Sequence, residues 1–181
     1  MLFKAIHRQV AAPASRTFFR SVSVGAKLPA IKLFDGSPGN EFNLVEEIGN
    51  SKAVIIGVPG AFSPGCTASH IPGYLHHLRD FNEKGYQKFY IIAVNDAFVT
   101  KAWSDSLLHE TGTDQIKFLA DPAGEFTGDL DLLFDAKKFF GNDRSKRYAL
   151  LVENGKVSKT FIEPDNTSVN VSAADKVLEQ A

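Results

Sequence analysis

The chain contains very little cysteine: its 181 residues include one, Cys66. A single cysteine excludes any disulfide within the chain, and therefore a fold held by such cross-links. No apolar run approaches the roughly 20 residues of a membrane-spanning helix, which argues against membrane insertion. The formal net charge of −1 gives no indication of nucleic acid binding. With 44% hydrophobic residues, the sequence predicts one globular domain with a sizeable core.

Acidic residues are missing from the start of the chain, where the first carboxylate is Asp35. Residues 1–24 are instead basic and amphipathic, and they lack the continuous apolar segment of a secretory signal. The basic residues of this leader are Lys4, Arg8, Arg16 and Arg20. The sequence predicts a mitochondrial targeting presequence over 1–24 and a domain over 25–181 that resides in the matrix. The alternative is a basic tail with no targeting role.

The region around Cys66 has the pattern of a strand, a loop and a helix. Residues 54–58 form an apolar, β-branched run that is typical of a buried parallel strand. Two prolines and two glycines interrupt the chain over 59–65, and helical spacing of apolar residues resumes after Cys66. A thiol at a helix N-terminus is biased towards the thiolate, the form that attacks electrophiles. The alternative is an inert buried cysteine, the commoner role of this residue.

A reactive thiolate at Cys66 requires more than the helix terminus. A free cysteine has a pKa of about 8.5, and a helix dipole lowers it by at most about 1.5 units. A neighbouring cation shifts an acid by roughly one to three units more, so a second group is expected. Residue types alone do not identify it among 20 lysines and arginines. Ser63, three positions before the cysteine, adds a hydroxyl that can hydrogen-bond at the sulfur.

Spacing around Cys66 also resembles a known family. The run Pro59-x-x-x-Ser63-x-x-Cys66 matches the P-x-x-x-(T/S)-x-x-C signature of peroxiredoxins, and 58–66 is similar to the peroxiredoxin 5 (type II) subfamily. Four later segments resemble that subfamily in the same order: 94–99, 118–122, 146–150 and 162–165. The resemblance implies an α/β, thioredoxin-like fold with a central mixed sheet, helices on both faces and an N-terminal hairpin. It implies no metal or organic cofactor, and a homodimer packed near the active-site loop.

The resemblance assigns roles to individual residues. Cys66 is expected to attack hydrogen peroxide or an organic hydroperoxide and to become a sulfenic acid. Arg147 is expected to be the second cation, and both Arg147 and Ser63 to donate hydrogen bonds in the transition state. Pro59 is expected to shape and dry the pocket, although it is also interpretable as a simple loop breaker. Gly65 and Phe140 are the expected substrate-binding residues; Phe139 and Phe140 match pocket positions of the subfamily, with a core role as the default.

The reduction of oxidised Cys66 is predicted from one position at which this sequence differs from two-cysteine members of the subfamily. Two-cysteine members of the subfamily carry a resolving cysteine shortly after the Glu-Pro-Asp segment, and Val171 occupies that place. The sequence therefore predicts a one-cysteine cycle with an external thiol, either glutathione with glutaredoxin or thioredoxin. A Cys66–Cys66 disulfide between subunits is the alternative to this cycle. A non-enzymatic redox sensor with an oxidisable Cys66 is the alternative to peroxidase activity.

The remaining sequence predicts a regular alternation of elements. Strands are expected at 30–34, 41–44, 54–58, 89–94, 116–120, 148–152 and 157–161, with Asn154-Gly155 as the turn of the last hairpin. Helices are expected after Cys66 with a kink at Pro72, at 97–108, at 125–134 and after Ser172 as its cap. The helical histidines His70, His76 and His77 lack carboxylate or thiolate companions for a metal. They are interpreted as surface or helix-packing residues.

Overall fold

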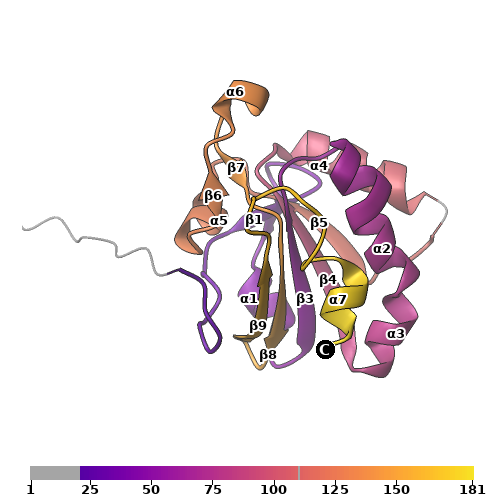
Figure 1. Cartoon of the computed structure of the whole chain (residues 1–181). Helices are drawn as coiled ribbons and strands as arrows, with labels where there is room; N and C mark the ends of the chain where they lie inside the picture. Colours follow the sequence, from indigo (N-terminus) through magenta and orange to yellow (C-terminus); the bar gives the residue numbers. More distant parts are fainter. Residues whose placement is uncertain (1–20, 110) are drawn as a thin grey trace, which may run out of the picture.

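A seven-stranded mixed sheet forms the centre of the molecule, with helices on both faces (Figure 1). The structure, a computed structural model, describes residues 21–109 and 111–181, so the predicted leader lies almost entirely outside the described residues. The strand order is β2-β1-β5-β4-β3-β8-β9. The strands are β1 (Leu33–Asp35), β2 (Glu41–Phe42), β3 (Lys52–Val58), β4 (Tyr86–Ala93), β5 (Ile116–Ala120), β8 (Tyr148–Glu153) and β9 (Lys156–Ile162). This arrangement confirms the predicted α/β, thioredoxin-like class.

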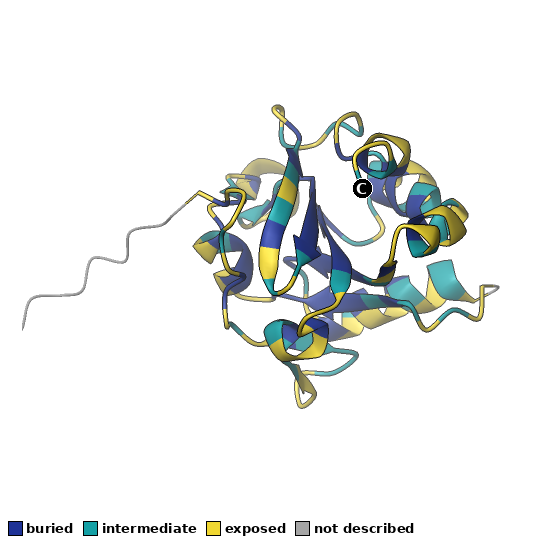
Figure 2. Cartoon of the chain, turned by 90° about the horizontal axis from the view of Figure 1, so that it is seen from below, coloured by how far each residue is buried: buried dark blue, intermediate teal, exposed yellow. Residues whose placement is uncertain are grey.

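The centre of the sheet is buried on both faces. β3 pairs in parallel with β4, and β4 with β5, whereas β8 pairs antiparallel with β3 on the other side. Residues 53–58 of β3 are all buried, as the continuous apolar run predicts (Figure 2). Because both faces of β3 are covered, a ligand can be reached from this strand only at its carboxyl end, which is where α/β sheets bind ligands. There the chain enters the loop before Cys66.

Helices cover the two faces with separate hydrophobic clusters. One face carries α2 (Ile71–His76), α3 (Leu78–Glu83), α4 (Ala97–Leu108) and α7 (Ala174–Leu178), and their buried side chains include Tyr74, Phe81, Trp103 and Val177. The opposite face carries α1 (Leu44–Ile48) and α5 (Glu125–Asp129), which contribute Leu44, Ile48 and Phe126. The predicted helix over 97–108 is confirmed at both ends.

The predicted helix over 125–134 is too long. α5 ends at Asp129, and the next residues form the strand β6 (Leu133–Phe134), which pairs with β7 (Arg144–Ser145). Asp131 has a φ of 59°, a left-handed conformation that ends helical spacing. The short helix α6 (Lys137–Phe140) lies between these strands and projects from the body of the molecule (Figure 1).

The predicted strand over 41–44 and the predicted helix cap at Ser172 both differ from the structure. The N-terminal hairpin is present, but β2 ends at Phe42, and Asn43 caps α1 by accepting a hydrogen bond from the Glu46 N–H. Ser172 does not cap α7, which has Ala173 at its N-cap position. The Ser172 hydroxyl donates instead to Glu163 Oε1 at 2.7 Å. A capping hydroxyl would accept from a backbone N–H of the helix, whereas here the hydroxyl acts as a donor to a buried carboxylate, a strong hydrogen bond to a charged acceptor.

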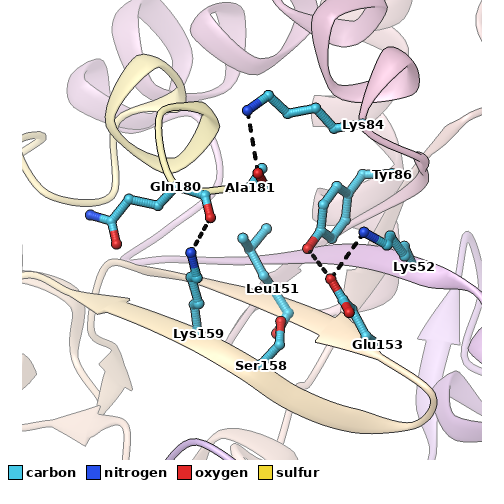
Figure 3. A network of polar contacts seen from close by, with 9 residues as sticks. All are labelled: Lys52, Lys84, Tyr86, Leu151, Glu153, Ser158, Lys159, Gln180 and Ala181. Carbon is cyan, nitrogen blue, oxygen red and sulfur yellow. Dashed lines mark hydrogen bonds and ion pairs between the residues drawn. The ribbon is translucent and has the colours of Figure 1, made fainter.

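The hairpin of β8 and β9 is confirmed. Asn154 and Gly155 have φ values of 51° and 69°, the positive values that a tight type I′ turn requires. Polar contacts hold this end of the sheet together, including a 2.7 Å hydrogen bond from the Tyr86 hydroxyl to Glu153 (Figure 3). This end lies opposite the carboxyl end of β3, away from Cys66. In the part of the chain that the structure describes, no helix has the length and apolar character to cross a bilayer.

Candidate active site

Cys66 lies in the first turn of a helix at the carboxyl end of β3, in agreement with its predicted place at a helix N-terminus. The first helical hydrogen bond runs from the Thr67 N–H to the Ser63 carbonyl at 2.9 Å. The backbone N–H groups of the residues before Thr67, including that of Cys66, therefore have no acceptor within the helix. Residues 66–70 form a π-helical turn, η1 (Cys66–His70), in which the Ile71 N–H bonds to the Cys66 carbonyl. Pro72 explains the wider turn, since its ring has no N–H and would clash with the carbonyl four residues earlier.

Two side chains donate hydrogen bonds to the sulfur of Cys66. The Ser63 hydroxyl donates a hydrogen bond to Cys66 Sγ at 2.8 Å, and Arg147 Nη1 donates to the same sulfur at 3.4 Å. Cys66 is 0% exposed. The structure therefore brings together the residues that the sequence and the resemblance select, and it places a cation and a hydroxyl donor on one buried thiol.

Arg147 is held in place along its whole length. It precedes β8, where its N–H donates to the Asn166 carbonyl at 2.7 Å and its carbonyl accepts from Glu163 at 3.0 Å. Its side-chain Nε donates to the Thr167 carbonyl at 2.9 Å. Arg147 is buried, so its guanidinium is held by these protein hydrogen bonds and does not move freely in solvent. A fixed cation beside a thiol favours the thiolate over the neutral form.

The pairing of β3 with β8 brings Arg147 to the active-site loop. Gly57 lies opposite Tyr148 in this pairing, and a Cβ on Gly57 would lie 2.0 Å from the Tyr148 ring. The ring is fully buried and fills the space above the glycine. A glycine at this position of β3 therefore allows β8, and the arginine next to it, to approach the loop.

His70 is the site residue that the sequence interpretation missed. It is 1% exposed, and Arg147 Nη1 lies 3.1 Å from its Nδ1. Its pKa is lowered to about 3, first by burial and then by the charge of Arg147, so the imidazole is neutral at physiological pH. His70 lies four residues after Cys66, and residues at this spacing share one face of a helix. This spacing is the sequence pattern that could have identified His70 as a site residue.

The other two helical histidines fit their interpretation. His76 is exposed, and His77 pairs with Asp80 at 2.8 Å on the helix surface. Across the described ranges 21–109 and 111–181, no three His, Cys, Asp or Glu side chains are grouped as metal ligands.

The loop around the cysteine is lined by further predicted residues. Pro59 is buried directly after β3, and a Cβ on Gly65 would lie 3.1 Å from Arg147 Nη2. Phe140 lies against Gly60, with its ring 3.3 Å from the place of a glycine Cβ, and the Arg144 guanidinium stacks on that ring at 4.9 Å. Gly65 and Phe140 therefore border the loop that carries Cys66.

The default core role for Phe139 and Phe140 is wrong. Phe139 is 81% exposed and Phe140 is 39% exposed. Both belong to α6, which projects beyond the sheet on the β6–β7 pair, away from the helices that cover the sheet (Figure 1). A count of phenylalanines favours a core position, but the tertiary placement of the helix decides against it.

Comparisons with known proteins agree with this site. The Redoxin family model matches residues 23–178. Peroxisomal membrane associated protein 20 of Schizosaccharomyces pombe is 48% identical, and the match covers 87% of this chain and 97% of that protein. The crystal structure of peroxiredoxin 5 from Alvinella pompejana has a TM-score of 0.76 and 36% identity, over 88% of this chain and 98% of that one. The antioxidant protein (1-Cys peroxiredoxin) of Plasmodium falciparum has a TM-score of 0.78 and 28% identity, over 88% and 98%.

The fold, the loop before Cys66 and these relatives lead to one classification. The resemblance to the peroxiredoxins is confirmed, and with it the expectation of an enzyme that uses a thiol to reduce peroxides. The chain belongs to the Redoxin family, within its peroxiredoxins, the thiol peroxidases.

Proposed function

We propose that Cys66 is the residue that reduces the peroxide, acting as a one-cysteine nucleophile. The sulfur of the thiolate forms a bond to the terminal oxygen of the peroxide while the O–O bond breaks. The displaced oxygen leaves as hydroxide or alkoxide and takes up a proton, which yields water or an alcohol and Cys66 sulfenic acid. The observation that carries this proposal is the convergence of Ser63 Oγ and Arg147 Nη1 on the buried sulfur.

Arg147 and Ser63 fit two roles in this step. In the resting enzyme they stabilise the negative charge on sulfur, and during attack they are donors beside the two oxygens on which charge develops. Arg147 Nη1 bonds to Cys66 and His70 and Nε to Thr167, whereas Nη2 faces Gly65. The guanidinium therefore presents a further donor towards the loop. Fixed donors of this kind lower the barrier more than mobile ones, because they need no reorganisation during the reaction.

Burial of Cys66 favours substrates that are slim at the reacting end. Hydrogen peroxide and the terminal oxygens of an organic hydroperoxide meet this condition, and the apolar ring of Phe140 beside Gly60 offers a contact for an organic substituent. Pro59 adds no N–H to the pocket, which limits the polar groups that would hold water there.

The reductant is an external thiol in this proposal. Cys66 is the single cysteine of the chain, and Val171 stands in the exposed segment where two-cysteine relatives carry the resolving residue. Glutathione with glutaredoxin, or thioredoxin, would therefore attack the sulfenic acid from outside. Since these thiols are larger than a peroxide and Cys66 is fully buried, the first helical turn has to open for this second step.

A homodimer is proposed from the exposed aromatic residues near the loop. Phe62 lies in the loop after β3, Phe98 lies in the first turn of α4 and Phe139 lies on α6, and all three are exposed. Large exposed apolar side chains gathered at one end of a protein mark interaction surfaces. Light scattering tests the proposal: Phe139→Asp should convert a dimer into a monomer, and a wild-type monomer at micromolar concentration would contradict it.

Mitochondrial import is proposed on the basis of the leader. Support comes from the acid-free, amphipathic composition of residues 1–24 and from the family match, which begins at residue 23. The proposed domain therefore spans 25–181. The relative from Schizosaccharomyces pombe bears a peroxisomal name, so peroxisomal targeting is the competing outcome of the experiment given in the Discussion.

One assay tests the proposed function as a whole. The purified protein is supplied with hydrogen peroxide or an organic hydroperoxide, together with glutathione and glutaredoxin or with thioredoxin and its reductase. Multiple turnovers with the wild type and none with Cys66→Ser are the expected result. A redox sensor would show oxidation of Cys66 without turnover with any reductant, and this outcome would replace the proposal.

A further inference from the structure

We propose that His70 is a positioning residue that aims the Arg147 guanidinium at Cys66. This inference rests on the proposed roles of Cys66 and Arg147 in peroxide reduction. His70 itself lies behind the arginine and is assigned no contact with substrate. Its function is to accept one hydrogen bond from Nη1 and so to fix the direction of the other N–H on the same nitrogen.

The geometry of the guanidinium carries the first step. Nη1 has two N–H groups in one plane, and it lies 3.1 Å from His70 Nδ1 and 3.4 Å from Cys66 Sγ. When one N–H points at the imidazole nitrogen, the planar group directs the other towards the sulfur. The Nε bond to the Thr167 carbonyl at 2.9 Å fixes the plane at its other end. Without an acceptor at His70, the guanidinium has one anchor fewer and the bond to sulfur loses its direction.

The tautomer of His70 carries the second step. His70 Nε2 lies 3.0 Å from the Ser172 carbonyl, which can only accept, so Nε2 must hold the proton. Since the buried imidazole is neutral, Nδ1 then has a free lone pair that faces the arginine. A positively charged imidazole would repel Arg147 and offer it no acceptor. The Ser172 carbonyl therefore selects the one form of His70 that can hold the guanidinium.

The third step is the support of the Ser172 carbonyl. Glu163 is buried, and its Oε1 accepts hydrogen bonds from the Asn170 N–H, the Ser172 N–H and the Ser172 hydroxyl at 2.7, 2.9 and 2.7 Å. These bonds fix the segment that carries the carbonyl. A continuous chain of hydrogen bonds thus runs from Glu163 through Ser172, His70 and Arg147 to the sulfur. Bonds of this kind inside a low-dielectric interior strengthen one another and define one geometry.

Three substitutions separate this role from simple packing. His70→Asn keeps an acceptor oxygen near the place of Nδ1 but cannot reach Ser172, whereas His70→Gln keeps a donor near the place of Nε2 and loses the acceptor at Nδ1. Tyr74→Phe is the matched control, because the Tyr74 hydroxyl donates to the same Ser172 carbonyl at 2.7 Å and is equally buried, without a contact to Arg147. The folded state of each variant is checked by its denaturation midpoint.

The readout is the rate constant for reaction of Cys66 with peroxide, followed by stopped-flow fluorescence of Trp103. His70→Gln should slow this step by about tenfold or more, the rate equivalent of one hydrogen bond to a charged group. His70→Asn should retain a rate within about threefold of the wild type, and Tyr74→Phe should match the wild type. Equal losses in the Asn and Gln variants, or a loss in Tyr74→Phe as large as that in His70→Gln, would overturn the positioning role.

The proposed function is tested separately in the same experiment. If Arg147→Ala and Cys66→Ser both reduce the rate while His70→Gln does not, the positioning role of His70 fails and the peroxidase mechanism stands. If Arg147→Ala reacts as fast as the wild type, the mechanism on which the role of His70 depends fails first.

Discussion

Arg147 Nη1 lies 3.4 Å from Cys66 Sγ, although 81 positions separate the two residues in the chain. The contact exists because β8 pairs with β3, so that the residue before β8 and the loop after β3 meet at one end of the sheet. A local motif supplies the proposed nucleophile and its hydroxyl donor, and the segment before a distant strand supplies the positive charge.

Removal of the charge at Arg147 should slow the reaction with peroxide. We expect Arg147→Ala to reduce the rate constant by on the order of a hundredfold or more, because it removes a fixed donor from both the thiolate and the transition state. Lys146→Ala removes the same charge from the neighbouring residue and should have little effect. A folded Arg147→Ala variant with an unchanged rate constant would exclude Arg147 from the mechanism.

Loss of the hydroxyl at Ser63 should have a smaller effect in the same direction. The 2.8 Å bond from Ser63 Oγ to the sulfur is lost in Ser63→Ala, and we expect a rate about ten- to a hundredfold lower, the equivalent of one bond to a charged acceptor. Ser63→Thr keeps the hydroxyl and should react at nearly the wild-type rate. Stopped-flow measurement of sulfenic acid formation compares the three proteins. Similar rates for the Ala and Thr variants would show that the hydroxyl is not used.

A side chain at Gly57 should destabilise the fold. The added Cβ of Gly57→Ala would lie 2.0 Å from the Tyr148 ring, so the ring or the strand has to move. We expect a loss of about 1–3 kcal/mol or more in the free energy of unfolding, as for other overpacked cores. Urea denaturation measures this loss. Gly39→Ala is the control, because nothing lies within 4 Å of its Cβ position, and its stability should stay close to that of the wild type. Equal midpoints for both variants would contradict the close contact.

Oxidation of Cys66 should stop at species that contain one chain. After one equivalent of peroxide, we expect a sulfenic acid that dimedone traps, and after glutathione is added, a mixed disulfide at Cys66. Excess peroxide during turnover should inactivate the enzyme through sulfinic acid. Intact mass spectrometry and non-reducing gels identify these products. Rapid, stoichiometric formation of a covalent dimer would instead indicate a Cys66–Cys66 disulfide between subunits.

The leader should direct a passenger protein to mitochondria. Residues 1–24 fused to a fluorescent reporter are expected to carry it into the matrix, because an amphipathic, basic and acid-free segment is recognised for import. The protein recovered from cells should begin beyond Arg16. A cytosolic or peroxisomal reporter would disprove this location. The same leader with Arg8, Arg16 and Arg20 changed to Glu is the control and should remain in the cytosol.

The features that the sequence determined are those that depend on neighbours in the chain. Local spacing predicts the buried strand before Pro59, a helix N-terminus around Cys66 and the Ser63 hydroxyl three residues earlier, and the structure has all three. The Asn154-Gly155 turn is local in the same sense, because the backbone angles of two residues decide it. Patterns of this kind need only the geometry of one helix turn, strand or hairpin.

The tertiary structure decided which distant groups meet the sulfur. Residue types alone leave 20 lysines and arginines as candidates for the cation, and the pairing of β8 with β3 selects Arg147. His70 was interpreted as a packing residue because the sequence does not show that Arg147 and the Ser172 carbonyl lie on either side of its ring. Ser172 was assigned to a helix cap because its partner Glu163 is distant from the helix. The physical reason is common to all three cases: hydrogen bonds between buried groups depend on which segments the core brings together, and a local pattern does not contain that information.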